Sequence, residues 1–113
     1  MEINMDNLTK QLIEFRNERD WEQFHNPKDM ALALSIEAAE LAELFLWKNE
    51  NESIMVSRER IAEELADVFS FAFLLAEKFE FNVAEIVQNK IELNRKKYPI
   101  EKAKGKSDKY NQL

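Results

Sequence analysis

Glycine and proline are scarce in this chain, and their scarcity constrains its fold more than any other feature. One glycine and two prolines among 113 residues supply little material for strand connections and tight turns, so the composition favours helices. The length is that of one domain, and apolar residues make up 45% of it, as in globular proteins. The sequence therefore predicts a single all-α domain over residues 1–113.

The spacing of apolar residues divides the chain into four predicted helices, arranged as in a four-helix bundle. These helices cover about residues 6–24, 27–48, 57–79 and 83–97. Asn26 is pushed out of the helical region by the proline after it, and Pro27 suits the first turn of the second helix. The polar residues 49–56 predict a loop. The lysine-rich residues 100–113 predict a mobile basic tail.

Two pairs of acidic residues lie in otherwise apolar parts of the second and third predicted helices. Glu37 and Glu40 form one pair, and Glu64 and Asp67 form the other. Residues three apart are neighbours on one helix face. Burying carboxylates is unfavourable unless a cation or a proton offsets their charge. If the pairs converge between facing helices, a hard divalent cation is their simplest partner. The residues alone leave an alternative open, in which each pair is an exposed acidic stripe.

Charge and cysteine content exclude several classes of function. A net charge of −6 argues against binding of polymeric nucleic acid, although a metal ion would still allow a small nucleotide to bind. The absence of cysteine excludes disulfides, thiolate metal sites and cysteine nucleophiles. Neither a stretch of about 18 uncharged apolar residues nor a signal peptide is visible, so we expect a cytoplasmic protein without a membrane partner.

The third predicted helix is apolar on almost every side from Leu65 to Ala76, which is typical of a helix buried all round. A four-helix monomer of this size offers few ways to bury a helix completely. We therefore expect another subunit to cover part of the second or third helix, in a homodimer or a homotetramer.

The acid pairs belong to a longer pattern. Glu-x-x-Glu on one helix followed by Glu-Glu-x-x-Asp on the next resembles the all-α nucleotide pyrophosphohydrolases, the MazG-like enzymes. The resemblance covers roughly residues 8–110 and points to the dCTP pyrophosphatase branch. It depends on four segments: residues 15–25 (FRNERDWEQFH), 40–47 (ELAELFLW), 63–68 (EELADV) and 94–99 (NRKKYP). One acid pair alone is weak evidence, whereas the full set in this order is specific.

This resemblance implies a nucleotide pool house-cleaning enzyme that hydrolyses a nucleoside triphosphate to the monophosphate and pyrophosphate. The expected substrate is a pyrimidine deoxynucleotide such as dCTP or a modified form of it. The family's Mg²⁺ ligands correspond to Glu37, Glu40, Glu64 and Asp67. Mg²⁺ neutralises triphosphate charge and lowers the pKa of a bound water, and a carboxylate can accept the proton. We expect Glu37 and Glu40 to be the catalytic residues, with Glu40 as the candidate base.

The resemblance also implies a pocket with aromatic walls for the base. Its residues would be Trp21, His25, Trp47 and Phe71. Stacking on an aromatic ring contributes about 1–3 kcal/mol per base. His25 lies four residues after Trp21, so both share a face if the first helix continues that far. Phe71 departs from the branch, where a tyrosine is expected, and this affects base preference. Without the resemblance, the aromatic residues would be interpreted as core.

Further contacts are implied on the fourth predicted helix. Lys90 would approach the phosphates and Asn94 the sugar or the base, with Arg95 in a similar role. The alternative from the residues alone is a pair of solvated side chains. Two other functions remain open for the whole chain: a nucleotide-binding regulator without turnover, and a helical interaction module with exposed acids.

Overall fold

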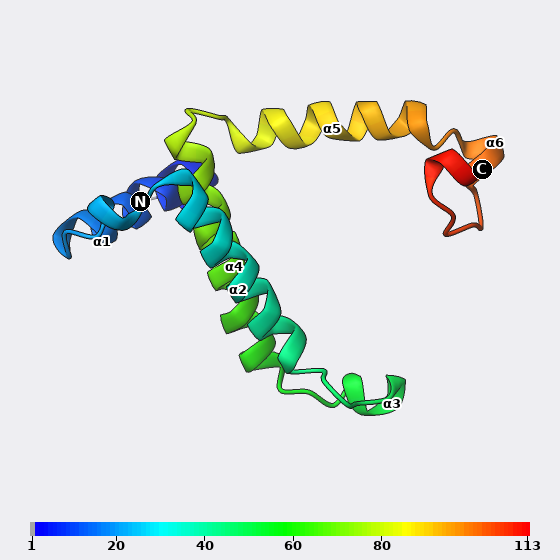
Figure 1. The fold of residues 1–113 in the computed structure, drawn as a ribbon, viewed down its shortest axis with the longest axis horizontal. Coiled ribbons are helices and arrows are strands. Elements are labelled where there is room, and N and C mark those ends of the chain that lie inside the picture. The colour runs from blue at the N-terminus through cyan, green and yellow to red at the C-terminus, as the bar shows by residue number, and fades with distance from the viewer. Residues whose placement is uncertain (1) are drawn as a thin grey trace. The chain divides into compact units, whose positions relative to one another are not determined.

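The computed structural model describes residues 2–113, and the chain divides into two compact units (Figure 1). The first unit ends at Glu80, and the second comprises Phe81–Leu113. Every regular element within residues 2–113 is helical, which confirms the predicted all-α class. Among these helices, none has the length and apolar character that a membrane span requires.

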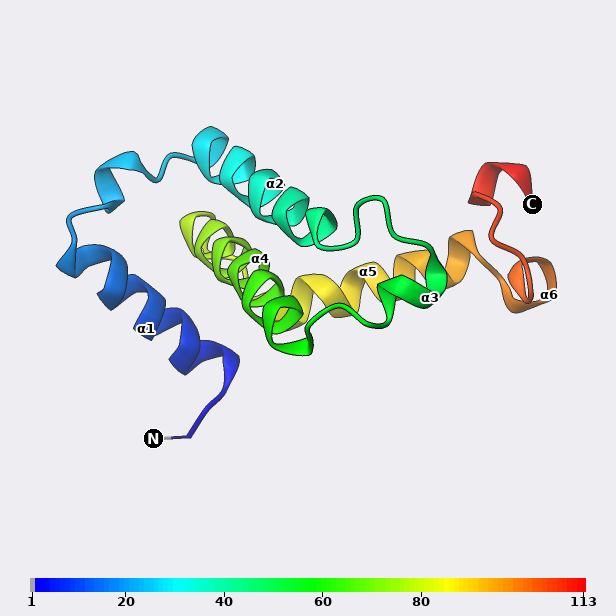
Figure 2. The same ribbon diagram turned by 90° about the horizontal axis from the view of Figure 1, so that it is seen from below.

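The first unit is built on two antiparallel helices, α2 (Pro27–Glu43) and α4 (Arg58–Lys78), which lie side by side (Figure 2). Helix α1 (Met5–Glu18) packs against α4. The 3₁₀ turn η1 (Glu22–Phe24) precedes α2, and the short helix α3 (Glu50–Ser53) lies between α2 and α4. Because α2 and α4 are antiparallel, the start of α2 lies beside the end of α4, and their middles face one another.

Polar side chains cap the helices as local sequence rules require. In each case the side chain before the helix accepts a hydrogen bond from the backbone N–H three residues later. These caps are Asn4 for α1, Asn26 for α2, Asn49 for α3, Ser57 for α4 and Asn82 for α5 (Val83–Lys97). Each cap of this kind stabilises its helix by about 1 kcal/mol.

The first helix is shorter than the sequence predicts, because α1 ends at Glu18 and not at Phe24. The N–H groups of the next two residues bond to carbonyl groups three residues back, which tightens the last turn. Asp20 then takes a left-handed conformation with φ of 56°, which aspartate tolerates better than most residues. The expectation that Trp21 and His25 share one helix face is therefore wrong, because they flank the separate turn η1.

The second helix also ends early, at Glu43 and not at Lys48. The N–H groups of residues 44–46 bond to carbonyl groups three residues back, and Trp47 has a φ of 63°, which is uncommon for a bulky side chain. This turn leaves Trp47 92% exposed. The predicted loop over residues 49–56 contains α3, so it is not wholly irregular.

The core is small for a chain of this length. The buried apolar side chains within residues 2–113 are Met30, Leu44, Leu74 and Ala76. Within the chain α4 is not buried all round, because Leu65 and Phe69 are 39% and 52% exposed. The contacts with α1 and α2 cover only part of its surface.

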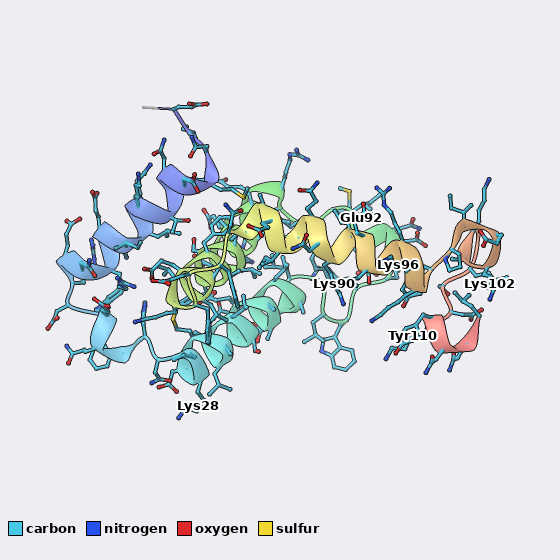
Figure 3. All side chains as sticks on the ribbon, turned by 90° about the horizontal axis from the view of Figure 1, so that it is seen from above. Lys28, Lys90, Glu92, Lys96, Lys102 and Tyr110 are labelled. Atoms are coloured by element: carbon cyan, nitrogen blue, oxygen red, sulfur yellow. The ribbon has the colours of Figure 1, made fainter. Side chains whose placement is uncertain are left out.

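The second unit contains α5, the short helix α6 (Ile100–Ala103) and the 3₁₀ turn η2 (Tyr110–Gln112). The limits of α5 match the predicted helix at residues 83–97. In the segment predicted as a tail, the Tyr110 ring (labelled in Figure 3) meets the ring of Tyr98 edge-on, with centroids 6.2 Å apart. The ammonium of Lys97 lies 4.9 Å from the centroid of the Tyr110 ring. Residues 98–113 therefore include two short helical elements and ring contacts.

Candidate metal and substrate site

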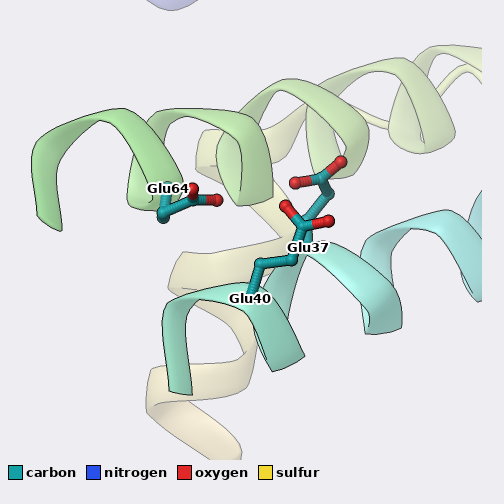
Figure 4. A group of neighbouring side chains, drawn as sticks. All are labelled: Glu37, Glu40 and Glu64. Carbon is teal, nitrogen blue, oxygen red and sulfur yellow. The ribbon is translucent and has the colours of Figure 1, made fainter. Parts of the chain in front are cut away.

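Three carboxylates meet where the C-terminal half of α2 packs against the N-terminal half of α4 (Figure 4). Glu37 and Glu40 project from α2 and Glu64 from α4, and one oxygen of each lies within 4.8 Å of the others. The antiparallel packing of the two helices produces this arrangement, because it places the acid face of α2 against that of α4. The three groups are therefore close enough to bind one cation together.

Two carboxylate oxygens in this cluster are buried without a hydrogen-bond donor. They are Oε2 of Glu37 and Oε2 of Glu64, and neither has a hydrogen-bond partner within residues 2–113. Burial, together with the neighbouring carboxylates, raises the pKa of Glu37 from 4.5 to about 7. The pKa of Glu64 is also raised, first by burial and then by the charge of Glu40. The site therefore favours any positive charge or proton that reaches it.

Asp67 lies outside the cluster of three but acts on it electrostatically. It is exposed on α4, one helical turn beyond Glu64, and its charge raises the pKa of both Glu37 and Glu64. Of the four acids predicted as metal ligands, the structure thus brings three together and leaves the fourth at their edge.

The donor set fits a hard divalent cation. Carboxylate oxygens are the ligands that Mg²⁺ prefers, and Mg²⁺ usually binds through few protein groups while keeping several waters. The two buried oxygens without donors have the character expected of atoms that accept a metal bond. A cation here would also offset the repulsion that raises the pKa values of Glu37 and Glu64.

A polar pocket of about 360 Å³ opens beside the cluster, and the sequence analysis missed its basic residues. Its lining includes Glu40 and Glu64 together with Lys48 and Arg60. The charge of Arg60 lowers the pKa of Glu64 and so opposes the other influences on that group. The sequence held a signal for Arg60, because this residue precedes Glu64 by one helical turn and therefore shares its helix face.

Two of the predicted base-pocket residues come together at the C-terminal half of α4. The rings of His25 and Phe71 lie 6.4 Å apart between centroids, and His25 Nδ1 is buried without a hydrogen-bond partner in the described chain. Trp21 instead packs edge-on against Phe15, with centroids 5.8 Å apart. Burial is the first cause that lowers the pKa of His25, followed by the charges of nearby basic residues.

Trp47 does not join the other aromatic residues within the chain. It follows the C-terminal end of α2, whereas His25 precedes the N-terminal end of the same helix. At 1.5 Å per residue, α2 separates the two positions by roughly 25 Å. The expectation of one wall containing both residues is therefore wrong for a single subunit.

The remaining predicted contacts belong to the second unit. Lys90 (labelled in Figure 3) and Asn94 line one apolar-edged pocket of about 510 Å³ on α5, together with Ile86, Val87 and Ile91. The guanidinium Nε of Arg95 lies 3.5 Å from a carboxylate oxygen of Glu92. Lys90 and Asn94 thus share a face of α5, as their spacing predicts.

Comparisons with known proteins identify the family to which this chain belongs. A model of the MazG-like family matches residues 32–113. The dCTP pyrophosphatase 1 of Homo sapiens is 40% identical to this chain, and that of Mus musculus is 38% identical; each match covers 99% of this chain and 69% of the relative. A pyrophosphatase from Archaeoglobus fulgidus has a solved structure with a TM-score of 0.81 and 38% identity, covering 88% of this chain and 95% of that one. The chain therefore belongs to the MazG-like family, and its relatives confirm the predicted likeness to the dCTP pyrophosphatase branch.

Proposed function

We propose that this protein is a nucleoside triphosphate pyrophosphatase that uses Mg²⁺ and acts on dCTP or a modified form of it. Water attacks the α-phosphorus, and the bond from that phosphorus to the oxygen that bridges to the β-phosphorus breaks. The electron pair leaves with pyrophosphate, and the proton of the water passes to a carboxylate. The products are a nucleoside monophosphate and pyrophosphate.

The carboxylate cluster between α2 and α4 is the main support for this function. Glu37, Glu40 and Glu64 bring carboxylate oxygens within 4.8 Å of one another, and two buried oxygens in the cluster have no donor among the described residues. This arrangement is costly without a cation. The relatives of this chain are pyrophosphatases, and a cation between carboxylates suits hydrolysis of a phosphoanhydride, because it offsets the charge of the phosphate chain.

The positions of the acidic and basic residues suggest a role for each in the reaction. Glu37, Glu40, Glu64 and Asp67 would hold Mg²⁺. When bound, it supplies charge neutralisation and a lowered pKa for water. Glu40 is the candidate proton acceptor, because it belongs both to the cluster and to the adjoining pocket. Lys48 and Arg60 on the same pocket would attract the phosphate chain.

Recognition of the nucleotide is assigned to the aromatic and polar residues that the resemblance implies. His25 and Phe71 would contact the base, with Trp21 at the opposite end of η1 and Trp47 supplied by a second subunit. Contacts of Lys90, Asn94 and Arg95 with the substrate stay predictions. Replacing each residue by alanine tests them, because the loss of a substrate contact should raise KM.

A second copy of the chain is part of the proposal. An apolar pocket of about 620 Å³ lies between α1 and α4, and its lining includes Leu8, Leu12, Phe15, Phe69 and Phe73. Phe15 and Phe69 are about half exposed. Exposed apolar patches of this kind mark interfaces between proteins. A homodimer or homotetramer that covers this surface would also explain why α4 is apolar on almost every side.

The proposal is tested by a substrate panel with the purified protein and Mg²⁺. dCTP, 5-modified dCTP, dATP, dTTP and dUTP are compared, and the phosphorus product is identified by ³¹P NMR. We expect pyrophosphate and a monophosphate, fastest from dCTP or a 5-modified form. Release of inorganic phosphate alone, or no release from any substrate, would overturn the proposal. Glu64→Gln should be inactive, whereas Glu14→Gln on the exposed side of α1 should retain activity.

A further inference from the structure

Arg16 is a charged side chain that lies almost completely buried. It lies in the last turn of α1, is 4% exposed, and is the charged side chain that the described residues bury most completely. Its Nε donates a hydrogen bond to the side-chain oxygen of Asn17 at 3.1 Å, and its Nη1 is buried without a hydrogen-bond partner within residues 2–113. A buried guanidinium is unfavourable unless opposite charges surround it.

The opposite charges come from two other elements. Arg16 Nη2 lies 3.7 Å from a carboxylate oxygen of Glu22 in η1, and Nη1 lies 3.6 Å from one of Glu77 on α4. Lys78 on α4 lies 3.7 Å from the other oxygen of Glu22. Glu22 therefore forms ion pairs with Arg16 of α1 and with Lys78 of α4 at the same time. The ion pairs connect three elements at a single point.

The ion pairs of Glu22 join the short turn η1 to α1 and to α4. Hydrogen bonds of 2.9 Å from the Phe24 N–H to the Trp21 carbonyl and from the Gln23 side chain to the Asp20 carbonyl shape the turn, but neither of them reaches α4. The backbone N–H of Trp21 also donates to the carbonyl of Arg16 at 3.0 Å. Both the side chain and the backbone of Arg16 thus fix the segment that begins at Trp21 and ends at His25.

That segment carries two of the residues assigned to the base. His25 follows η1 directly, and its ring lies 6.4 Å from the ring of Phe71 on α4. We propose that Arg16 is a positioning residue for base recognition, which acts by holding Glu22 against α4 so that His25 stays beside Phe71. The proposal rests on the proposed function for the roles of His25 and Phe71 in binding a nucleotide base.

The charges around His25 agree with this arrangement. Burial lowers the pKa of His25 first, then Arg16 from α1 and Lys78 from α4 lower it further, while Glu22 raises it. The lowered pKa favours the neutral imidazole, in which one nitrogen is a donor and the other an acceptor. A neutral imidazole in a fixed orientation can distinguish the hydrogen-bonding edge of one base from that of another.

The test uses the single histidine of the chain as an NMR probe. Arg16→Met removes the charge and keeps much of the volume, and Arg16→Lys restores a positive charge. Arg19→Met is the matched control, because Arg19 lies near the same end of α1 but stacks its guanidinium 3.6 Å from the Phe15 ring centroid. We expect Arg16→Met to abolish the nuclear Overhauser effect between His25 and Phe71 and to raise the pKa of His25. Arg16→Lys should recover the Overhauser effect in part, and Arg19→Met should leave both readings unchanged.

Kinetics supply the second readout. Arg16→Met should raise KM for the nucleotide by about tenfold with little change in kcat, within the losses that misplaced contact residues cause. Glu22→Gln changes an exposed residue and should lose the same Overhauser effect, so the idea stays testable if Arg16→Met does not fold. A folded variant of either kind with the wild-type Overhauser effect and KM would overturn the proposal. The NMR readings need no nucleotide, so an inactive wild-type protein would overturn the proposed function without deciding this one.

Discussion

Glu37 on α2 and Glu64 on α4 belong to one carboxylate cluster, and each buries one oxygen that has no hydrogen-bond partner within residues 2–113. Residues from two helices thus form a cluster that neither helix would form alone. The same antiparallel packing that buries Met30 brings these charges together. The fold therefore concentrates negative charge at one point, which a cation or a proton can relieve.

The raised pKa of Glu37 predicts that the metal-free protein loses stability as the pH rises. With a pKa of about 7 in the folded chain and 4.5 when unperturbed, Glu37 loses its proton in the unfolded chain first. Its contribution to stability is full below pH 4.5 and is lost as the pH rises through 7. Solvent at this half-buried site screens part of the effect. At pH 8, Glu37→Gln should raise Tm by roughly 4 °C, the shift that about 1 kcal/mol produces.

Thermal unfolding in EDTA at pH 5 and pH 8 checks this expectation. Glu14→Gln serves as the control, because it removes an exposed carboxylate of α1 that is not part of the cluster. Equal Tm values for wild type and Glu37→Gln at pH 8 would contradict the unfavourable burial of Glu37 beside the other carboxylates.

Mg²⁺ should stabilise the protein more at pH 8 than at pH 5. The cation competes with protons for the same oxygens, so acid weakens its binding. At a concentration one hundred times Kd, bound Mg²⁺ should add about 2.7 kcal/mol to the free energy of unfolding. Differential scanning fluorimetry with increasing Mg²⁺ measures the effect. Glu64→Gln should remove most of the shift, and an undiminished shift in that variant would locate the cation elsewhere.

Arg60 should matter for the phosphate chain and for the pH profile. Arg60→Met removes a positive charge from the pocket beside Glu40, and we expect kcat/KM to fall about tenfold, the loss typical of one charge-assisted contact. Because the charge of Arg60 lowers the pKa of Glu64, the acidic limb of the pH–rate profile should move to higher pH. A profile of kcat/KM against pH tests both parts, with Arg58→Met at the exposed start of α4 as the control.

Trp47 should act in the active site of a neighbouring subunit. Trp47→Ala and Glu37→Gln should each be nearly inactive alone. A mixture refolded together should regain about a quarter of wild-type activity, because half of randomly paired dimers would contain one intact site of two.

A mixture of Glu37→Gln with Glu64→Gln is the matched control for this experiment. The two acids belong to one cluster within a single chain, so this mixture should stay inactive. Recovery in the control, or none in the test mixture, would contradict a shared site.

Local sequence was sufficient to predict much of the fold. Apolar spacing and capping residues such as Asn26 and Asn82 indicate where the helices begin, and the starts of α2, α4 and α5 agree with the prediction. The ends of α1 and α2 were missed. They depend on the left-handed conformations of Asp20 and Trp47, which hydrophobic periodicity does not encode.

The candidate site was predictable in part for a similar reason. The spacing of three between Glu37 and Glu40 determines that they share one helix face, whatever the rest of the chain does. Their meeting with Glu64, and the closeness of Arg60, depend on the rotation and direction of α4 against α2. The burial of Arg16 was not predictable in this way, because nothing near it on α1 signals its ion pairs with Glu22 of η1 and Glu77 of α4.

The helical class of this protein, the spacing within each acid pair and the family pattern could all be predicted from the printed residues, because helix formation and spacing depend on residues close together in the chain. The packing of the helices was needed to establish which carboxylates lie together, which basic side chains lie beside them, and that Trp47 lies far from His25 within one chain. Those relationships join residues far apart in sequence, and they follow from how helix surfaces pack against one another.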